Sequence, residues 1–108
     1  MAEARPGETP EMRRLRRRID ALDRRIVALL GERTRLGVEM GAAKAAAGRR
    51  AVRDPERERE VLLRVATANA GPLPQAELLA LYRRLMAATR RLERNARRRD
   101  GAHTDPAA

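Results

Sequence analysis

The stretch LRRRIDALDRRIVALLGERTRLGVEMGAAK, residues 15–44, decides the fold. Its apolar residues recur at alternating steps of four and three, which is the spacing of one narrow stripe along a long helix. The members of this stripe are Leu15, Ile19, Leu22, Ile26, Leu29, Leu36 and Met40. The same spacing places Arg33 and Lys44 on the stripe. Because a buried charge is costly unless it is paired, these two cations either leave the core or meet an anion there.

The rest of the chain shows helical spacing and no strand pattern, so we predict an all-α protein with one long helix and two shorter ones. The expected helices cover residues 11–47, about 54–70 and 75–97. Gly48 suits the end of the first helix, and Asp54-Pro55 is typical of an N-cap followed by a first-turn proline. The expected helical domain covers residues 11–97, between disordered tails at 1–10 and 98–108.

The long first helix predicts self-association. Two shorter helices of the same chain cannot bury the whole stripe, and helices of this kind usually find the missing partner in a second copy. We therefore expect a homodimer with the long helices side by side. The alternative is a simple coiled coil with a disordered C-terminal half, which is disfavoured because the second and third helices have apolar faces of their own.

Composition excludes several classes of protein. The 108 residues bound the chain to one small domain, and the absence of cysteine excludes disulfides and thiolate metal sites. The single histidine, His103, lies in a polar end and argues against a histidine metal site or catalytic triad. No apolar run is long enough to span a bilayer, and the start lacks the apolar core of a signal peptide. A cytoplasmic protein without a membrane segment is expected.

The net charge of +10 predicts attraction to anions, and Lys44 is the single lysine of the sequence. A basic helical nucleic-acid-binding protein is therefore the alternative from another class. Against it, Tyr82 is the single aromatic residue, whereas base stacking uses several. Arg33 and Lys44 also lie on an apolar stripe, whereas cations that contact DNA belong on an outer face.

Polar residues interrupt the apolar faces of all three expected helices. They are Arg33 and Lys44 on the first, Arg57 and Glu58 on the second, and Thr89 and Glu93 on the third. Each has an ordinary explanation alone: an arginine extends to solvent, Glu58 offsets the helix dipole, Thr89 fills a gap, and Glu93 pairs with Arg90 or Arg97. Together they favour a pocket for a multiply charged anion, because the cations exceed the anions.

A series of motifs then resembles a known family. The motifs are L-R-x-x-I-D-x-L-D, L-L-x-E-R, G-x-x-K and V-R-D-x-x-R-E, in this order, and the resemblance to the all-helical class of chorismate mutases covers Leu15 to Glu93. It implies an intertwined homodimer with two identical sites. It also implies an isomerase of the shikimate pathway and aromatic amino acid biosynthesis, which rearranges chorismate to prephenate without a cofactor or metal.

The resemblance implies how the two substrate carboxylates are held. Arg16 would reach into the partner's site and bind one of them. Arg33 would bind a carboxylate in its own site, with Arg57 near the same charges. Bidentate arginines of this kind would hold the flexible substrate in its reactive, folded conformation.

The remaining roles implied by the resemblance concern the ether oxygen and the ring. Lys44 would donate to the ether oxygen and contact a carboxylate, and Glu93 would face that oxygen from the other side. Because an ionised carboxylate would repel the developing charge, we expect Glu93 to act in its protonated form. Glu58, with the backbone at Asp54, would hold the ring hydroxyl, and Thr89 stands where the family has a small hydroxyl residue.

Two questions stay open at the level of sequence: the substrate, and the need for a partner protein. Relatives with this scaffold act as isochorismate-pyruvate lyases or as mutases of 4-amino-4-deoxychorismate, and all of them bind a similar dicarboxylate. Some short members work poorly alone, so an activating partner protein is a further expectation. The arginine-rich C-terminus offers a surface for such a partner.

Overall fold

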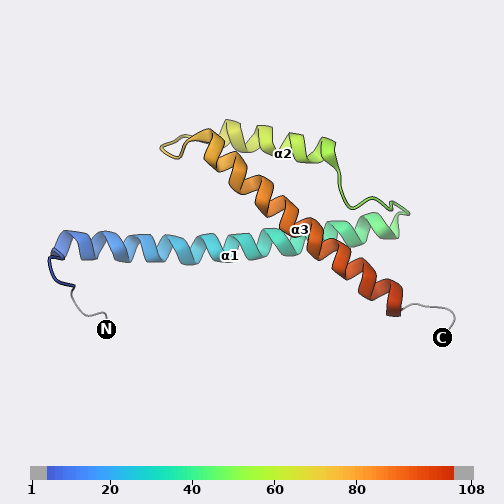
Figure 1. Cartoon of the computed structure of the whole chain (residues 1–108), viewed down its shortest axis with the longest axis horizontal. Coiled ribbons are helices and arrows are strands. Elements are labelled where there is room, and N and C mark those ends of the chain that lie inside the picture. The colour runs from blue at the N-terminus through green and yellow to red at the C-terminus, as the bar shows by residue number, and fades with distance from the viewer. Residues whose placement is uncertain (1–4, 104–108) are drawn as a thin grey trace. The chain divides into compact units, whose positions relative to one another are not determined.

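The computed structural model describes residues 5–103 and shows three helices and no strand within that range. They are α1 (Pro10–Ala46), α2 (Pro55–Ala68) and α3 (Gln75–His103), which Figure 1 traces in chain order. The all-α class and the pattern of one long and two shorter helices are therefore confirmed.

The first helix begins earlier than its apolar pattern indicates. The Thr9 side chain accepts a hydrogen bond from the Met12 backbone N–H at 3.1 Å, which satisfies one of the free donors at the start of α1. Residues 5–9 were expected to be disordered, but they form a turn closed by a bond from Glu8 N–H to the Arg5 carbonyl at 2.9 Å. Residues 1–4 of the predicted tail lie outside the described part of the chain.

Local signals fix the connection from α1 to α2. Gly48 has φ +83°, a left-handed conformation that glycine adopts readily at the end of a helix. There the Arg49 N–H donates to the Lys44 carbonyl at 2.9 Å, and this bond closes the end of α1. Asp54 caps α2, because its side chain accepts from the Arg57 N–H at 3.0 Å. Both ends follow the sequence prediction.

The third helix begins at Gln75 as predicted and continues past its expected end. We expected disorder from residue 98 onward, yet α3 runs to His103. Arginine and alanine are good helix formers, and the run of residues 96–100 contains neither glycine nor proline, so nothing in it stops the helix. Residues 104–108 lie outside the described range.

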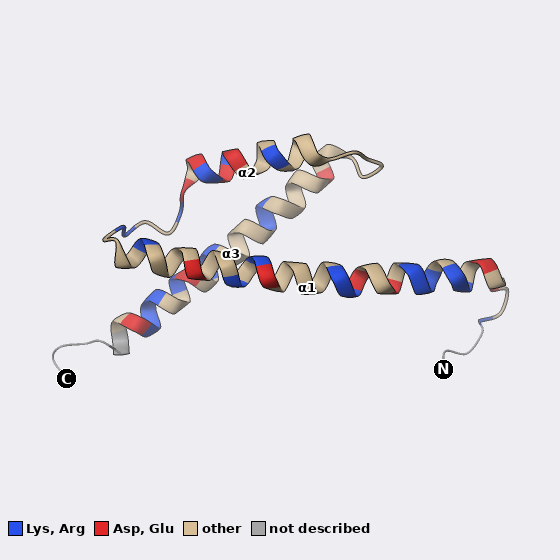
Figure 2. Cartoon of the chain, turned by 180° about the vertical axis from the view of Figure 1, so that it is seen from behind, with Lys and Arg blue, Asp and Glu red and all other residues tan. Residues whose placement is uncertain are grey.

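The chain divides into two units, at the boundary between Thr34 and Arg35. The first unit holds the beginning of α1, and Figure 2 shows basic and acidic residues interleaved along it. Its apolar stripe is about half exposed: Leu15 is 42% exposed, Ile19 55%, Leu22 50%, Ile26 51% and Leu29 59%. These residues leave a continuous row of apolar side chains exposed along the first unit.

The second unit holds residues 35–46 of α1 together with α2 and α3, and α2 and α3 pack against each other. Two glycines let α3 approach the end of α1 closely. A Cβ atom added at Gly37 would lie 2.5 Å from the Thr89 Cγ2 atom, and one added at Gly41 would lie 2.9 Å from the Glu93 Cγ atom. Small residues at these two positions therefore bring Thr89 and Glu93 against α1.

Replacing Gly37 by alanine is expected to destabilise the protein by about 1–3 kcal/mol, the usual cost of overpacking, despite the better helix propensity of alanine. The Thr89 methyl group is the atom that collides, so Thr89→Ser in the same chain should restore most of the loss. Gly101→Ala is the matched control, because a Cβ atom there meets nothing within 4 Å. Denaturant unfolding measures all of these variants, and an unaltered midpoint for Gly37→Ala would contradict the close approach.

Candidate active site

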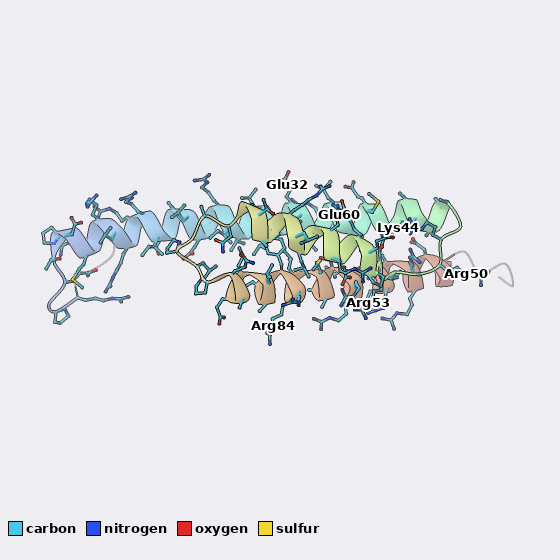
Figure 3. The ribbon with its side chains drawn as sticks, turned by 90° about the horizontal axis from the view of Figure 1, so that it is seen from above. Glu32, Lys44, Arg50, Arg53, Glu60 and Arg84 are labelled. Atoms are coloured by element: carbon cyan, nitrogen blue, oxygen red, sulfur yellow. The ribbon has the colours of Figure 1, made fainter. Side chains whose placement is uncertain are left out.

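Lys44 lies in the last turn of α1 with its side chain only 15% exposed. Its Nζ atom is 4.0 Å from an Asp54 carboxylate oxygen, and the Arg49 guanidinium lies 3.8 Å from the same oxygen. Figure 3 shows Lys44 near the loop that carries Arg50 and Arg53. Lys44 thus lies beside a carboxylate of its own chain, and its predicted role towards a substrate stays a prediction. A separation of 4.0 Å is too long for a direct hydrogen bond, so the ammonium keeps protons to donate to a further acceptor.

Glu93 lies on α3 and is 9% exposed. Its Oε2 atom is buried and has no hydrogen-bond partner in the described part of the chain. Burial raises the pKa of the Glu93 carboxyl above its usual 4.5, although the positive charges of Lys44, Arg97, Arg90 and Arg94 oppose this rise. A carboxyl group with a raised pKa keeps its proton to a higher pH and can donate it in a hydrogen bond.

Thr89 is 6% exposed, one turn before Glu93. Its hydroxyl donates to the Leu85 carbonyl at 2.9 Å, so the hydroxyl proton is used within α3. The predicted burial of both Thr89 and Glu93 is confirmed. The contact of the Thr89 methyl group with α1 shows that this residue packs the helices together, which is the structural role that the sequence also allowed.

Glu58 of α2 forms an ion pair with Arg90 of α3, and each side chain is about one-fifth exposed. The sequence offered Arg90 as a partner for Glu93, whereas its guanidinium binds Glu58. The pair borders a pocket of about 250 Å³ between α2 and α3. The pocket is lined by Arg53, Pro55, Glu58, Arg59, Leu62, Arg83, Met86 and Arg90. Basic groups around an apolar floor suit an organic anion.

Arg97, which the sequence offered only as a partner of Glu93, makes two contacts that sequence reasoning missed. Its guanidinium donates to the Gly41 carbonyl at 3.2 Å and to the Arg50 carbonyl, which joins α3 to the end of α1 and to the loop. Spacing within α3 places Arg97 one turn after Glu93, but it gives no signal for contacts with residues so far away in the sequence.

The other expected site residues lie elsewhere. Arg57 pairs with Glu60 at 2.9 Å on the exposed face of α2. Arg16 pairs with Glu8 at 3.1 Å, and Arg33 is half-buried, both in the first unit. The site that the second unit itself brings together consists of Lys44, Asp54, Glu58, Thr89 and Glu93. The substrate-binding roles of Arg16, Arg33 and Arg57 stay predictions.

Comparison with known proteins identifies the family. The family model described as chorismate mutase type II matches residues 15–94, which include every predicted site residue. The chain belongs to the type II chorismate mutase family. The chorismate mutase of Thermus thermophilus, in its form II structure, has 33% sequence identity and a TM-score of 0.73, and the match covers 78% of this chain and 94% of that one. The resemblance inferred from the motifs is confirmed.

Curated relatives of this chorismate mutase family member are longer proteins. The bifunctional chorismate mutase/prephenate dehydratase of Stutzerimonas stutzeri is 37% identical over 91 residues, which are 81% of this chain and 25% of that protein. The bifunctional protein of the same name from Escherichia coli K12 is 51% identical over 53 residues, which are 49% of this chain and 14% of that protein. The chain thus spans a quarter or less of the length of these two relatives.

Within residues 5–103, no three acidic, histidine or cysteine side chains gather closely enough to hold a metal ion. None of the described helices combines the length and apolar character needed to cross a bilayer.

Proposed function

We propose that this chain catalyses the rearrangement of chorismate to prephenate as an isomerase. The observation that carries the proposal is the Glu93 carboxyl, which has a raised pKa, a buried Oε2 atom without a hydrogen-bond partner among the described residues, and the charge of Lys44 acting on it. The chain also belongs to the type II chorismate mutase family. In the reaction a carbon–oxygen bond breaks while a carbon–carbon bond forms in the same molecule, and negative charge grows on the ether oxygen. Donors aimed at that oxygen stabilise the transition state more than the substrate.

Four side chains of the second unit have a role in this proposal. The Lys44 ammonium donates to the ether oxygen, and the protonated Glu93 carboxyl donates from α3. Glu58 accepts from the ring hydroxyl and is oriented by its pair with Arg90. Asp54 holds Lys44 near the start of α2. No side chain acts as a nucleophile or takes a proton from the substrate, and the reaction uses no cofactor.

The functional form in this proposal is an intertwined homodimer. The half-exposed stripe of the first unit supports it, because each leucine or isoleucine covered by a partner contributes on the order of 1 kcal/mol. Arg16 of each chain binds a substrate carboxylate in the partner's site, and Arg33 and Arg57 bind the other charges. The proposed setting is the cytoplasm and the shikimate pathway towards aromatic amino acids, with an activating partner protein as an optional further component.

Mixed dimers test whether Arg16 crosses to the partner. Arg16→Ala and Lys44→Ala homodimers should both be nearly inactive. A purified dimer of one Arg16→Ala chain and one Lys44→Ala chain should regain about half of the wild-type activity, because one of its two sites holds both intact residues. A dimer of one Lys44→Ala chain and one Glu93→Ala chain is the matched control: both residues belong to the same chain's site, so neither site is restored. No recovery in the first mixture would contradict the shared site.

A further inference from the structure

Arg97 joins three segments of the second unit. Its Nη2 atom donates to the Gly41 carbonyl at 3.2 Å, and its Nη1 atom donates to the Arg50 carbonyl. One guanidinium on α3 thus binds the end of α1 and the middle of the α1–α2 loop, residues 47–54. Its Nε atom is buried and has no partner in the described part of the chain. Burying such a group is costly, which indicates a role beyond a solvated surface charge.

The loop that Arg97 binds connects two members of the candidate site. It begins three residues after Lys44 and ends at Asp54, whose carboxylate lies 4.0 Å from the Lys44 ammonium. Its residues 49–51 are exposed, so apolar packing does not hold this stretch in place. The Arg50 carbonyl is at the centre of the stretch, and its bond to Arg97 ties the loop to α3.

We propose that Arg97 is a positioning residue, which holds the α1–α2 loop against α3 and so fixes Asp54 relative to Lys44. The catalytic consequence rests on the proposed mutase activity, whereas the effect on the loop does not. Without the Arg97 guanidinium the loop opens more often, the Lys44 ammonium loses its fixed direction, and the substrate binds more weakly.

The charge of Arg97 has a separate effect on Glu93. The positive groups that act on the Glu93 carboxyl are Lys44 from α1 and Arg90, Arg94 and Arg97 from α3. Of these cations, Arg90 also forms an ion pair with Glu58 of α2. Removing the Arg97 charge raises the pKa of Glu93 further, because one of the groups that favour its ionised form is lost. Lysine at this position keeps the charge but cannot replace the two-pronged guanidinium.

Hydrogen exchange of the loop amides tests the positioning directly. In both Arg97→Lys and Arg97→Gln, amides of residues 47–53 should exchange roughly tenfold faster than in the wild type, because each loses contacts that oppose local opening. Arg98→Gln is the matched control, since Arg98 is exposed and binds Asn95 of its own helix. Amides in the middle of α2 report global unfolding and should not change. Loop exchange at the wild-type rate in both variants overturns the proposal.

Steady-state kinetics distinguish the positioning effect of Arg97 from the effect of its charge on Glu93. Both Arg97 variants should raise KM for chorismate by roughly tenfold with a smaller change in kcat, because substrate binding needs the ordered loop. Arg97→Gln should also extend activity to higher pH, while Arg97→Lys keeps the wild-type pH profile. If the loop amides exchange faster but KM and kcat stay unchanged, loop order does not affect substrate binding. This result would overturn the proposed catalytic consequence of Arg97. If the protein lacks mutase activity altogether, the exchange result still decides whether Arg97 holds the loop.

Discussion

Replacing Lys44 by alanine is expected to lower kcat/KM for chorismate by at least roughly 10²–10³-fold, the usual effect of removing one donor to a developing oxyanion. Lys44 is the single lysine of the chain, and its side chain is largely buried beside Asp54. The charge that it stabilises appears in the transition state, so kcat should fall more than KM rises. Steady-state loss of chorismate, followed by absorbance, measures both constants.

Two further variants make this test specific. Arg84→Ala removes a cation that points away from α2 in Figure 3, and it should leave turnover unchanged, which controls for the loss of a positive charge. Lys44→Arg keeps the charge with a different geometry, and it should recover only a small part of the activity. If Lys44→Ala retains wild-type turnover while the fold is intact, Lys44 is not the donor.

Activity is expected to fall as pH rises through the raised pKa of Glu93. The protonated carboxyl is the donor, so the active form of the enzyme is present below the pKa of Glu93 in the folded protein. This form is lost above that pKa. Burial places this pKa above the usual 4.5. Above it, kcat/KM should fall by about tenfold per pH unit, as for one essential protonated group. Glu93→Gln has a permanent donor, so its profile should be flat and its rate should exceed that of the wild type at alkaline pH.

Stability gives an independent measure of the same group. A carboxyl whose pKa is raised on folding stabilises the folded state fully below its unfolded pKa, and this contribution is lost as pH rises through the folded pKa. The melting temperature of the wild type should therefore fall relative to that of Glu93→Gln as pH rises from about 4.5 towards neutral. Parallel melting curves together with a flat wild-type rate profile would show that Glu93 does not act in protonated form.

Local sequence signals explain most of the fold. The capping residues Asp54 and Thr9, the glycine at position 48 and the start at Gln75 depend on neighbours in the chain. Such short-range interactions can be recognised from residue types and spacing. The burial of Thr89 and Glu93 was also predictable, because helical periodicity alone assigns them to the inner face.

The residues that the sequence did not reveal depend on long-range packing. The pair of Glu58 with Arg90 joins two helices, and the contacts of Arg97 join α3 to α1 and to the loop. Spacing within one helix predicts neighbours three or four residues apart, so it suggested Glu93 as the partner of Arg90. Arg57 and Glu60, by contrast, are three residues apart on one helix, so spacing could have predicted their pair. Helix propensity alone could have predicted that the arginine-rich end of α3 is helical.

The most direct test of the proposed function is the identity of the product. The purified full chain is incubated with chorismate, and the mixture is separated by chromatography, with Lys44→Ala in parallel. We predict that the wild type forms prephenate and that the variant leaves chorismate almost unchanged. Chorismate that stays intact with the wild type would contradict the account, and most clearly if isochorismate instead gave salicylate and pyruvate, or if 4-amino-4-deoxychorismate were rearranged.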